Sequence, residues 1–224
     1  MAEKPYFQFK QCNDSNFMYG RTKNGVKHKI QWIVIHFTAG KGDTAKNNAD
    51  YFARCGGLNA SAHFFVDENE IWQTVNLANT AWHCGSETGY YYNSCRNVNS
   101  IGIEMCSRTD SNGRYYIKEE TVQRAVALVQ ELMAKYNVPA SRVLRHYDVT
   151  GKACPEPFVR QPAQWERFKQ EVSEVEKQKK IKLNGKEKTV HVIEKDGYNY
   201  IKLQDLRDDK ISIGYDGVPV VEVK

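Results

Sequence analysis

The sequence lacks a long apolar run, a strong excess of one charge and an internal repeat. Within its 224 residues, no stretch approaches the roughly 20 apolar residues that a membrane-spanning helix needs, so we predict no membrane insertion. The net charge of +5 is small and the basic residues are scattered, which excludes a typical nucleic-acid-binding protein. With 41% hydrophobic and 26% charged residues, the composition is that of an ordinary globular protein.

The N-terminal segment also lacks a basic stretch followed by an apolar core, so a secretion signal is not predicted. We therefore expect the protein to be made and folded in a cytoplasm, and any target outside the cell to be reached by another route. A chain of this length does not need disulfides to fold, and we expect its six cysteines to be mostly reduced. A bridge between Cys84 and Cys95, across a loop, stays open.

Apolar runs predict the strands of an α/β domain. Residues 30–37 (IQWIVIHF) are apolar on both faces, which is typical of a strand buried in the middle of a sheet. A polar, tyrosine-rich stretch at residues 85–99 is interpreted as a loop. Further strands are expected at residues 61–67, 70–75, 100–106 and 143–149.

Helical periodicity and a change in composition predict the domain organisation. Residues 118–136 place apolar side chains on one helix face, and further helices are expected at residues 43–54 and 164–177. A charged stretch at residues 176–180 precedes a β-like segment with an Asn-Gly turn signal. We predict a catalytic domain at residues 1–176 and a small β-rich module at residues 177–224.

Three residues of metal-binding type lie near predicted strand ends. His36 ends the central strand, at the edge where α/β sheets place their sites. His146 and Cys154 are separated by a loop to which Gly151 gives backbone freedom. Each residue alone is weak evidence, because lone histidines and buried cysteines are usually core residues. Together they supply imidazole and thiolate ligands, which suit a catalytic Zn²⁺ with three protein ligands and one open position.

Five motifs carry a family resemblance that covers roughly residues 28–175. They are, in order, WIVIHFTAG, SAHFFVD, AWHCG, NSIGIEMC and HYDVTGKACP. The sequence resembles the type-2 N-acetylmuramoyl-L-alanine amidases, which include phage endolysins and the peptidoglycan recognition proteins. The resemblance implies a central mixed β-sheet flanked by helices. It also implies a zinc-dependent hydrolase that cuts the amide bond between N-acetylmuramic acid and L-alanine in peptidoglycan.

The same resemblance implies roles for single residues. His36, His146 and Cys154 would hold the zinc ion, and Glu104 and Lys152 would be catalytic. Glu104 could take a proton from the attacking water and pass it to the leaving amine. Lys152 could stabilise the oxyanion as a fixed positive charge.

Several side chains near these motifs are candidates for contact with the substrate. We predict that His83, Trp82 and Trp72 bind it, and that His83 lies near the metal without being a ligand. The tyrosines at residues 90–92 either stack against sugar or peptide or pack structurally, and the sequence leaves both open.

The sequence departs from the family at one position of the second strand. Some members have a tyrosine there, directly before a histidine, that assists catalysis. This chain has Ala62, so no tyrosine role is carried over and more weight falls on Glu104. The following His63 is interpreted as a structural residue.

Three alternatives remain. A recognition module would bind peptidoglycan without cleaving it, although the complete set of ligands favours an enzyme. A cysteine hydrolase would use Cys154 as nucleophile and His146 as base, but Pro155 has no N–H for an oxyanion hole. A bacterial autolysin would have the same activity as the phage or prophage endolysin that we expect.

The expected partner is peptidoglycan, reached at the cell wall after release through a holin pore or by another route. For the C-terminal module we consider three roles, which are wall binding, dimerisation and capping of the first domain.

Overall fold

The structure is a computed structural model that describes residues 7–86, 89–92, 94–174, 177–195, 198–201, 203–215 and 219–223. The chain divides into two compact units, Met1–Val172 and Ser173–Lys224. The sequence placed this boundary slightly later, between residues 176 and 177. Within the described ranges, no helix has the length and apolar character needed to cross a membrane.

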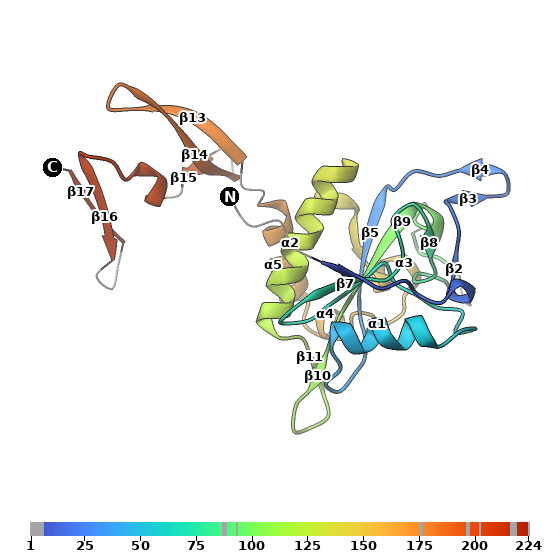
Figure 1. The fold of residues 1–224 in the computed structure, drawn as a ribbon. Helices are drawn as coiled ribbons and strands as arrows, with labels where there is room; N and C mark the ends of the chain where they lie inside the picture. Colours follow the sequence, from blue (N-terminus) through green and yellow to red (C-terminus); the bar gives the residue numbers. More distant parts are fainter. Residues whose placement is uncertain are drawn as a thin grey trace. The chain divides into compact units, whose positions relative to one another are not determined.

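A six-stranded mixed sheet forms the centre of the first unit (Figure 1). Its strands lie in the order β1-β7-β6-β9-β5-β12, and only the β6–β7 pair is antiparallel. The strand bounds are β1 Gln8–Phe9, β5 Trp32–Phe37, β6 Phe64–Val66, β7 Ile71–Gln73, β9 Ser100–Met105 and β12 Val143–Arg145. The predicted α/β class with a mixed sheet is confirmed.

Alternation along the central strands gives the sheet two different faces. Ile33 and Ile35 of β5 point into the main core, where helices α2 (Glu119–Tyr136), α4 (Glu156–Arg160) and α5 (Pro162–Ser173) supply the apolar partners. Val34 and His36 point to the other face, because successive strand residues alternate. The opposite face therefore carries the polar side chain at the strand end.

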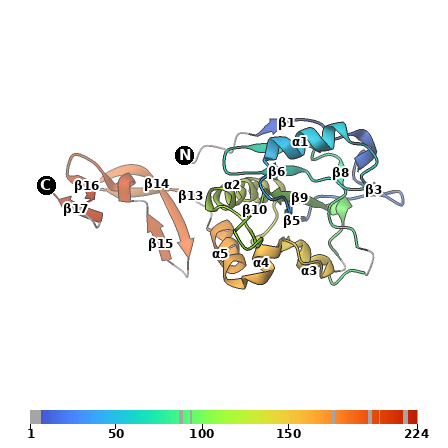
Figure 2. The ribbon, with the colours of Figure 1, turned by 90° about the horizontal axis from the view of Figure 1, so that it is seen from below.

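Helix α1 (Ala45–Arg54) covers part of that second face, where Ala45 packs with Phe65. Figure 2 shows it across the sheet from α2 and α5. The helix begins at a capping box, in which Thr44 Oγ1 accepts from Asn47 N at 3.0 Å and the Asn47 side chain accepts from Thr44 N at 3.3 Å. The predicted start of this helix is confirmed.

Two predicted elements end earlier than expected. The strand expected at residues 143–149 stops at Arg145, because the Asp148 carboxylate accepts from the Arg145 backbone N–H at 2.8 Å and starts helix α3, His146–Thr150. The helix expected to reach residue 177 ends at Ser173, and Lys177 begins strand β13.

Short elements complete the first unit. They are the strand pairs β2 (Phe17–Met18) with β8 (Thr80–Ala81), β3 (Thr22–Lys23) with β4 (Val26–Lys27) and β10 (Arg108–Thr109) with β11 (Tyr115–Tyr116), and the 3₁₀ turns η1 Asp14–Asn16, η2 Asn97–Asn99 and η3 Ala140–Arg142.

A buried arginine ties the start of the chain to this unit. Arg21 is 6% exposed, and its guanidinium donates to the carbonyls of Leu77 at 2.8 Å, Val98 at 3.1 Å and Ser100 at 3.0 Å. Charged groups are buried only when such partners satisfy them. Burial lowers the pKa of Arg21 to about 10, so it remains charged at neutral pH.

The second unit consists of strands, as predicted. Strands β13 (Lys177–Leu183), β14 (Lys186–Lys195) and β15 (Tyr198–Ile201) form one antiparallel sheet, and β16 (Ile211–Tyr215) pairs with β17 (Pro219–Val223). The turn η4 (Leu203–Leu206) follows β15. Asn184 and Gly185 have φ values of 51° and 78°, as a two-residue hairpin turn between β13 and β14 requires.

Candidate metal centre and active site

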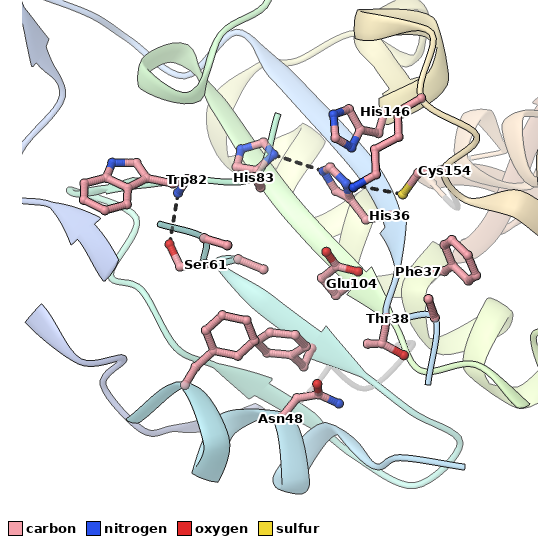
Figure 3. A pocket seen from close by; sticks show the side chains of 16 residues that line it. His36, Phe37, Thr38, Asn48, Ser61, Trp82, His83, Glu104, His146 and Cys154 are labelled. Carbon is pink, nitrogen blue, oxygen red and sulfur yellow. Dashed lines mark hydrogen bonds between the residues drawn. The ribbon is translucent and has the colours of Figure 1, made fainter. Parts of the chain in front are cut away.

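A cavity of about 280 Å³ opens at the carboxyl end of β5 and β9 on the second face of the sheet. His36 and Glu104 are opposite each other in the β5–β9 register, so both side chains reach this cavity from the same face (Figure 3). The remaining lining residues are Phe37, Thr38, Ala39, Asn48, Phe52, Ala60, Ser61, Ala62, Phe65, Trp82, His83, His146, Lys152 and Cys154.

Three of these residues form a cluster that can hold a metal ion. The ligand atoms of His36, His146 and Cys154 lie within 4.8 Å of one another, and all three side chains are buried. Nδ1 of His36 lies 3.6 Å from Sγ of Cys154, and the two imidazole rings are 4.7 Å apart between centroids. His146 is the first residue of helix α3.

The nitrogen atoms of this cluster fit a metal. Nε2 of His146 is buried and meets no hydrogen-bond partner among the described residues, while the ring makes a hydrogen bond with the backbone of Gly85. Since Nε2 has no partner, that bond uses Nδ1. A buried polar atom without a partner is costly, and a metal ion beside His36 Nδ1 and Cys154 Sγ would supply the missing interaction.

Burial sets the protonation states of the ligands. It lowers the pKa of His146 to about 4 and that of His36 well below 6.5, so both are neutral and able to bind a metal at neutral pH. Burial, with Glu104 nearby, raises the pKa of the Cys154 thiol. A bound cation reverses this effect, because a coordinating thiol loses its proton.

Glu104 has the environment of a proton-transfer group. Burial raises its pKa to about 8, and the positive charge of Lys152 acts in the opposite direction. Its Oε2 is buried and has no hydrogen-bond partner within the part of the chain that is described. A carboxylate with an elevated pKa and a free oxygen in a cavity is a candidate acid or base.

The region that carries these residues matches a known family. The sequence profile described as N-acetylmuramoyl-L-alanine amidase matches residues 26–157, which include all three cluster residues as well as Glu104 and Lys152. The chain belongs to the N-acetylmuramoyl-L-alanine amidase family.

Two relatives within this amidase family come from species of Bacillus. CwlL, an N-acetylmuramoyl-L-alanine amidase of Bacillus licheniformis, is 35% identical over 159 residues, which cover 67% of this chain and 43% of that protein. BlyA, an N-acetylmuramoyl-L-alanine amidase of Bacillus subtilis (strain 168), is 32% identical over 178 residues, covering 74% of this chain and 45% of that protein. The chain thus spans less than half the length of these curated relatives.

Solved structures show the same amidase fold. PlyL aligns with a TM-score of 0.60 and 26% identity, covering 75% of this chain and 96% of that one. A mutant endolysin from Bacillus subtilis aligns with a TM-score of 0.57 and 28% identity, covering 75% of this chain and 99% of that one.

Of the three residues predicted to contact substrate, two line the cavity and one does not. Trp82 and His83 line the cavity. Trp72 is absent from the described lining and packs instead against the small cluster that contains Ala62 and Phe65. The cavity therefore gives no support to substrate binding by Trp72.

The tyrosines at residues 90–92 and His63 are not among the described residues that line the cavity. The Tyr91 ring covers Gly151, and Tyr92 makes an edge contact with Trp32 at 5.0 Å between centroids. His63 is fully buried, and its Nδ1 accepts from the Gly102 N–H at 3.0 Å. This environment agrees with the structural role predicted for His63. All six cysteines lie in the described residues and are free thiols.

Three polar lining residues, Asn48, Thr38 and Ser61, were missed by sequence reasoning. Asn48 projects from α1 and donates to Asp43 Oδ2 and the Thr44 carbonyl. Thr38 follows β5 and donates to Asp43 Oδ1 at 3.0 Å. The sequence did contain a signal for two of these positions. Thr38 is two residues after His36, and Asn48 is one turn inside a helix whose capping residues are visible in the sequence.

Proposed function

We propose that this protein is a zinc-dependent peptidoglycan amidase that hydrolyses the bond between N-acetylmuramic acid and L-alanine. The observation that carries the proposal is the convergence of His36, His146 and Cys154 beside Glu104 in one cavity. Two neutral imidazoles and a thiolate are donors that Zn²⁺ favours, and three ligands leave one position open.

The residues of the chain divide the chemistry among them. A zinc ion held by the three donors would polarise the scissile carbonyl and acidify the attacking water. In its ionised form, Glu104 would accept the proton of that water on its free oxygen and return it to the leaving amine. Lys152, which lines the same cavity, stabilises negative charge on the carbonyl oxygen in the transition state.

The alternative of a cysteine nucleophile is less well supported. Cys154 Sγ forms its imidazole hydrogen bond with His36, at 3.6 Å. The cysteine-hydrolase alternative needs this bond to come from His146, which would be its base. Burial raises the pKa of the Cys154 thiol, whereas a nucleophilic cysteine needs a lowered one.

Mass spectrometry of digested cell walls tests the proposed reaction. We expect stem peptides with a free L-alanine amine and glycan chains with an intact lactyl group. Elemental analysis should give one zinc per chain, and a chelator should abolish cleavage until zinc is restored. Cleavage at another bond, or cleavage that survives the chelator, would contradict the proposal.

We further propose that the protein acts as an endolysin at the cell wall, and that the unit Ser173–Lys224 holds it there. The side chains of Tyr198, Tyr200 and Tyr215 are 70%, 53% and 78% exposed. Tyr198 and Tyr200 alternate along β15 and so share one face. Exposed aromatic rings provide flat apolar surfaces with a polar tip, which suits stacking on sugar rings. Dimerisation through the same unit is the competing role.

A further inference from the structure

A row of buried hydrogen bonds leads from the backbone of the η2 region to the candidate metal ligand His36. The Ser100 hydroxyl lies 2.7 Å from the Arg96 carbonyl oxygen and 3.0 Å from Nε2 of His83. Nδ1 of His83 lies 3.0 Å from Nε2 of His36. The side chains of Ser100, His83 and His36 are 0%, 9% and 1% exposed, so water competes little for these bonds.

The chemistry of the groups fixes the direction of every bond in this row. A carbonyl only accepts, so the single hydroxyl proton of Ser100 goes to Arg96, and Ser100 Oγ accepts from Nε2–H of His83. A neutral imidazole carries one proton, so Nδ1 of His83 accepts from Nε2–H of His36. The Cys84 thiol, 3.8 Å from Ser100 Oγ, is a weaker partner and does not compete with the carbonyl at 2.7 Å.

This direction leaves the lone pair of His36 on Nδ1. Nδ1 is the atom that faces Cys154 Sγ at 3.6 Å, on the side where the three donor atoms meet. The opposite tautomer would place a proton on Nδ1 and block a metal at this point. Both ring nitrogens of His83 are used inside the protein, so neither is left to bind substrate.

The His83 ring is held in place by close packing. A Cβ atom at Gly102 would lie 2.4 Å from Cγ of His83, so the ring lies directly over this glycine of β9. The His83 backbone N–H donates to Asn97 Oδ1 at 3.0 Å. The ring meets His36 edge-on, at 5.1 Å between centroids. Its nitrogen atoms therefore have little freedom to find other partners.

We propose that His83 is a positioning residue, which together with Ser100 fixes His36 in the tautomer that binds the metal through Nδ1. The effect on metal binding rests on the proposed zinc function. The His36 tautomer itself is a property of the metal-free protein. Outer partners of this kind are worth about 10–100-fold in metal affinity when they are removed.

The test combines a spectroscopic reading with an affinity measurement. Long-range ¹H–¹⁵N NMR of the metal-free protein should show His36 protonated on Nε2. In Ser100→Ala, His83 Nε2–H loses the hydroxyl acceptor but keeps the Ser100 backbone nearby, so a larger share of His36 than in the parent protein should adopt the Nδ1–H form. Zinc affinity, measured by competition with a chromophoric chelator, should then fall about 10–100-fold.

Ser107→Ala is the matched control. Ser107 is also fully buried and donates to a backbone carbonyl, that of Gly40, at 2.8 Å. This variant should keep the tautomer and zinc affinity of the parent protein. The proposal is overturned if His36 carries its proton on Nδ1 in the parent protein, or if Ser100→Ala and Ser107→Ala behave alike in both measurements.

If Ser100→Ala fails to fold, the His36 tautomer measured in the parent protein still tests the proposal. Failure of the proposed function looks different, since the parent protein would then bind no zinc or cleave no wall while His36 still carried its proton on Nε2.

Discussion

His36 and Glu104 are register partners on the neighbouring parallel strands β5 and β9, so the candidate metal ligand and the candidate base leave the sheet side by side on one face. Both come from continuous strands of the central sheet, which hold the backbone of each residue in place. Their spacing is therefore determined by strand pairing rather than by a loop.

Replacing Glu104 should separate catalysis from metal binding. We expect Glu104→Gln to lower kcat about 10²–10⁴-fold, the usual contribution of a general acid–base group, while the zinc content stays unchanged. Wall turbidity and elemental analysis measure the two effects. Glu120→Gln, at an exposed position, is the control and should retain full activity. A loss of zinc in Glu104→Gln would instead assign this carboxylate to the metal site.

Zinc should stabilise the folded protein. A ligand that binds only the native state adds about 2.7 kcal/mol at a concentration one hundred times its Kd, so Tm should rise when zinc is added to metal-free protein. Because Cys154 is one of the three proposed zinc ligands, Cys154→Ala should abolish most of this rise in Tm. Cys12→Ala, which alters a buried cysteine outside the cluster, should preserve it. An equal rise in both variants would place the metal elsewhere.

The loss of stability at acidic pH should depend on Glu68. This carboxylate is bonded by Arg108 at 2.8 Å and by Lys118 at 2.9 Å. Burial alone would raise its pKa, but these partners lower it from 4.5 to about 2. Because the folded pKa lies below the unfolded one, the stabilisation is complete above about pH 4.5 and is lost as the pH falls toward 2.

Glu68→Gln should therefore reduce the free energy of unfolding by about 1–3 kcal/mol at pH 7. The difference from the parent protein should shrink between pH 4.5 and 3. Urea unfolding at several pH values measures this, with Glu120→Gln as the exposed control. A difference that does not change with pH would mean that charge pairing is not its cause.

Removal of the second unit should impair attachment but not chemistry. A chain ending at residue 174 keeps α5 and the whole cavity, so it should bind zinc and cleave soluble muropeptides at the parent rate, yet sediment less with intact walls. In the full chain, Tyr198→Ser combined with Tyr200→Ser should reduce sedimentation in the same way. Unchanged sedimentation together with a smaller mass by light scattering would favour dimerisation as the role of this unit.

Much of the site could be predicted because its residues follow continuous apolar strands. The run before His36 indicates a central strand, and the pattern around Glu104 indicates another, so their convergence at one sheet edge follows from the parallel arrangement. The position of His146 was harder to predict. Its segment resembles a strand, but the Asp148 side chain caps a helix that begins at His146.

The roles of Trp72 and His83 could not be predicted from their neighbours in sequence. Trp72 lies on the same sheet face as its register partner Phe65, yet the packing of α1 against this part of the face leaves it outside the described cavity lining. His83 contacts Ser100 and His36 because the segment that follows β8 places its ring over Gly102. Contacts of this kind depend on tertiary packing, which has no periodic signal.

The buried guanidinium of Arg21 has a consequence for how this protein can be divided. It precedes residue 26, where the family match begins. A fragment starting there would leave the carbonyls of Leu77, Val98 and Ser100 without their donor. At about 1–3 kcal/mol for each unmet buried group, the loss approaches the whole stability of a typical domain. We therefore expect the smallest fragment that folds to begin ahead of Arg21, N-terminal to the stretch that the family profile matches.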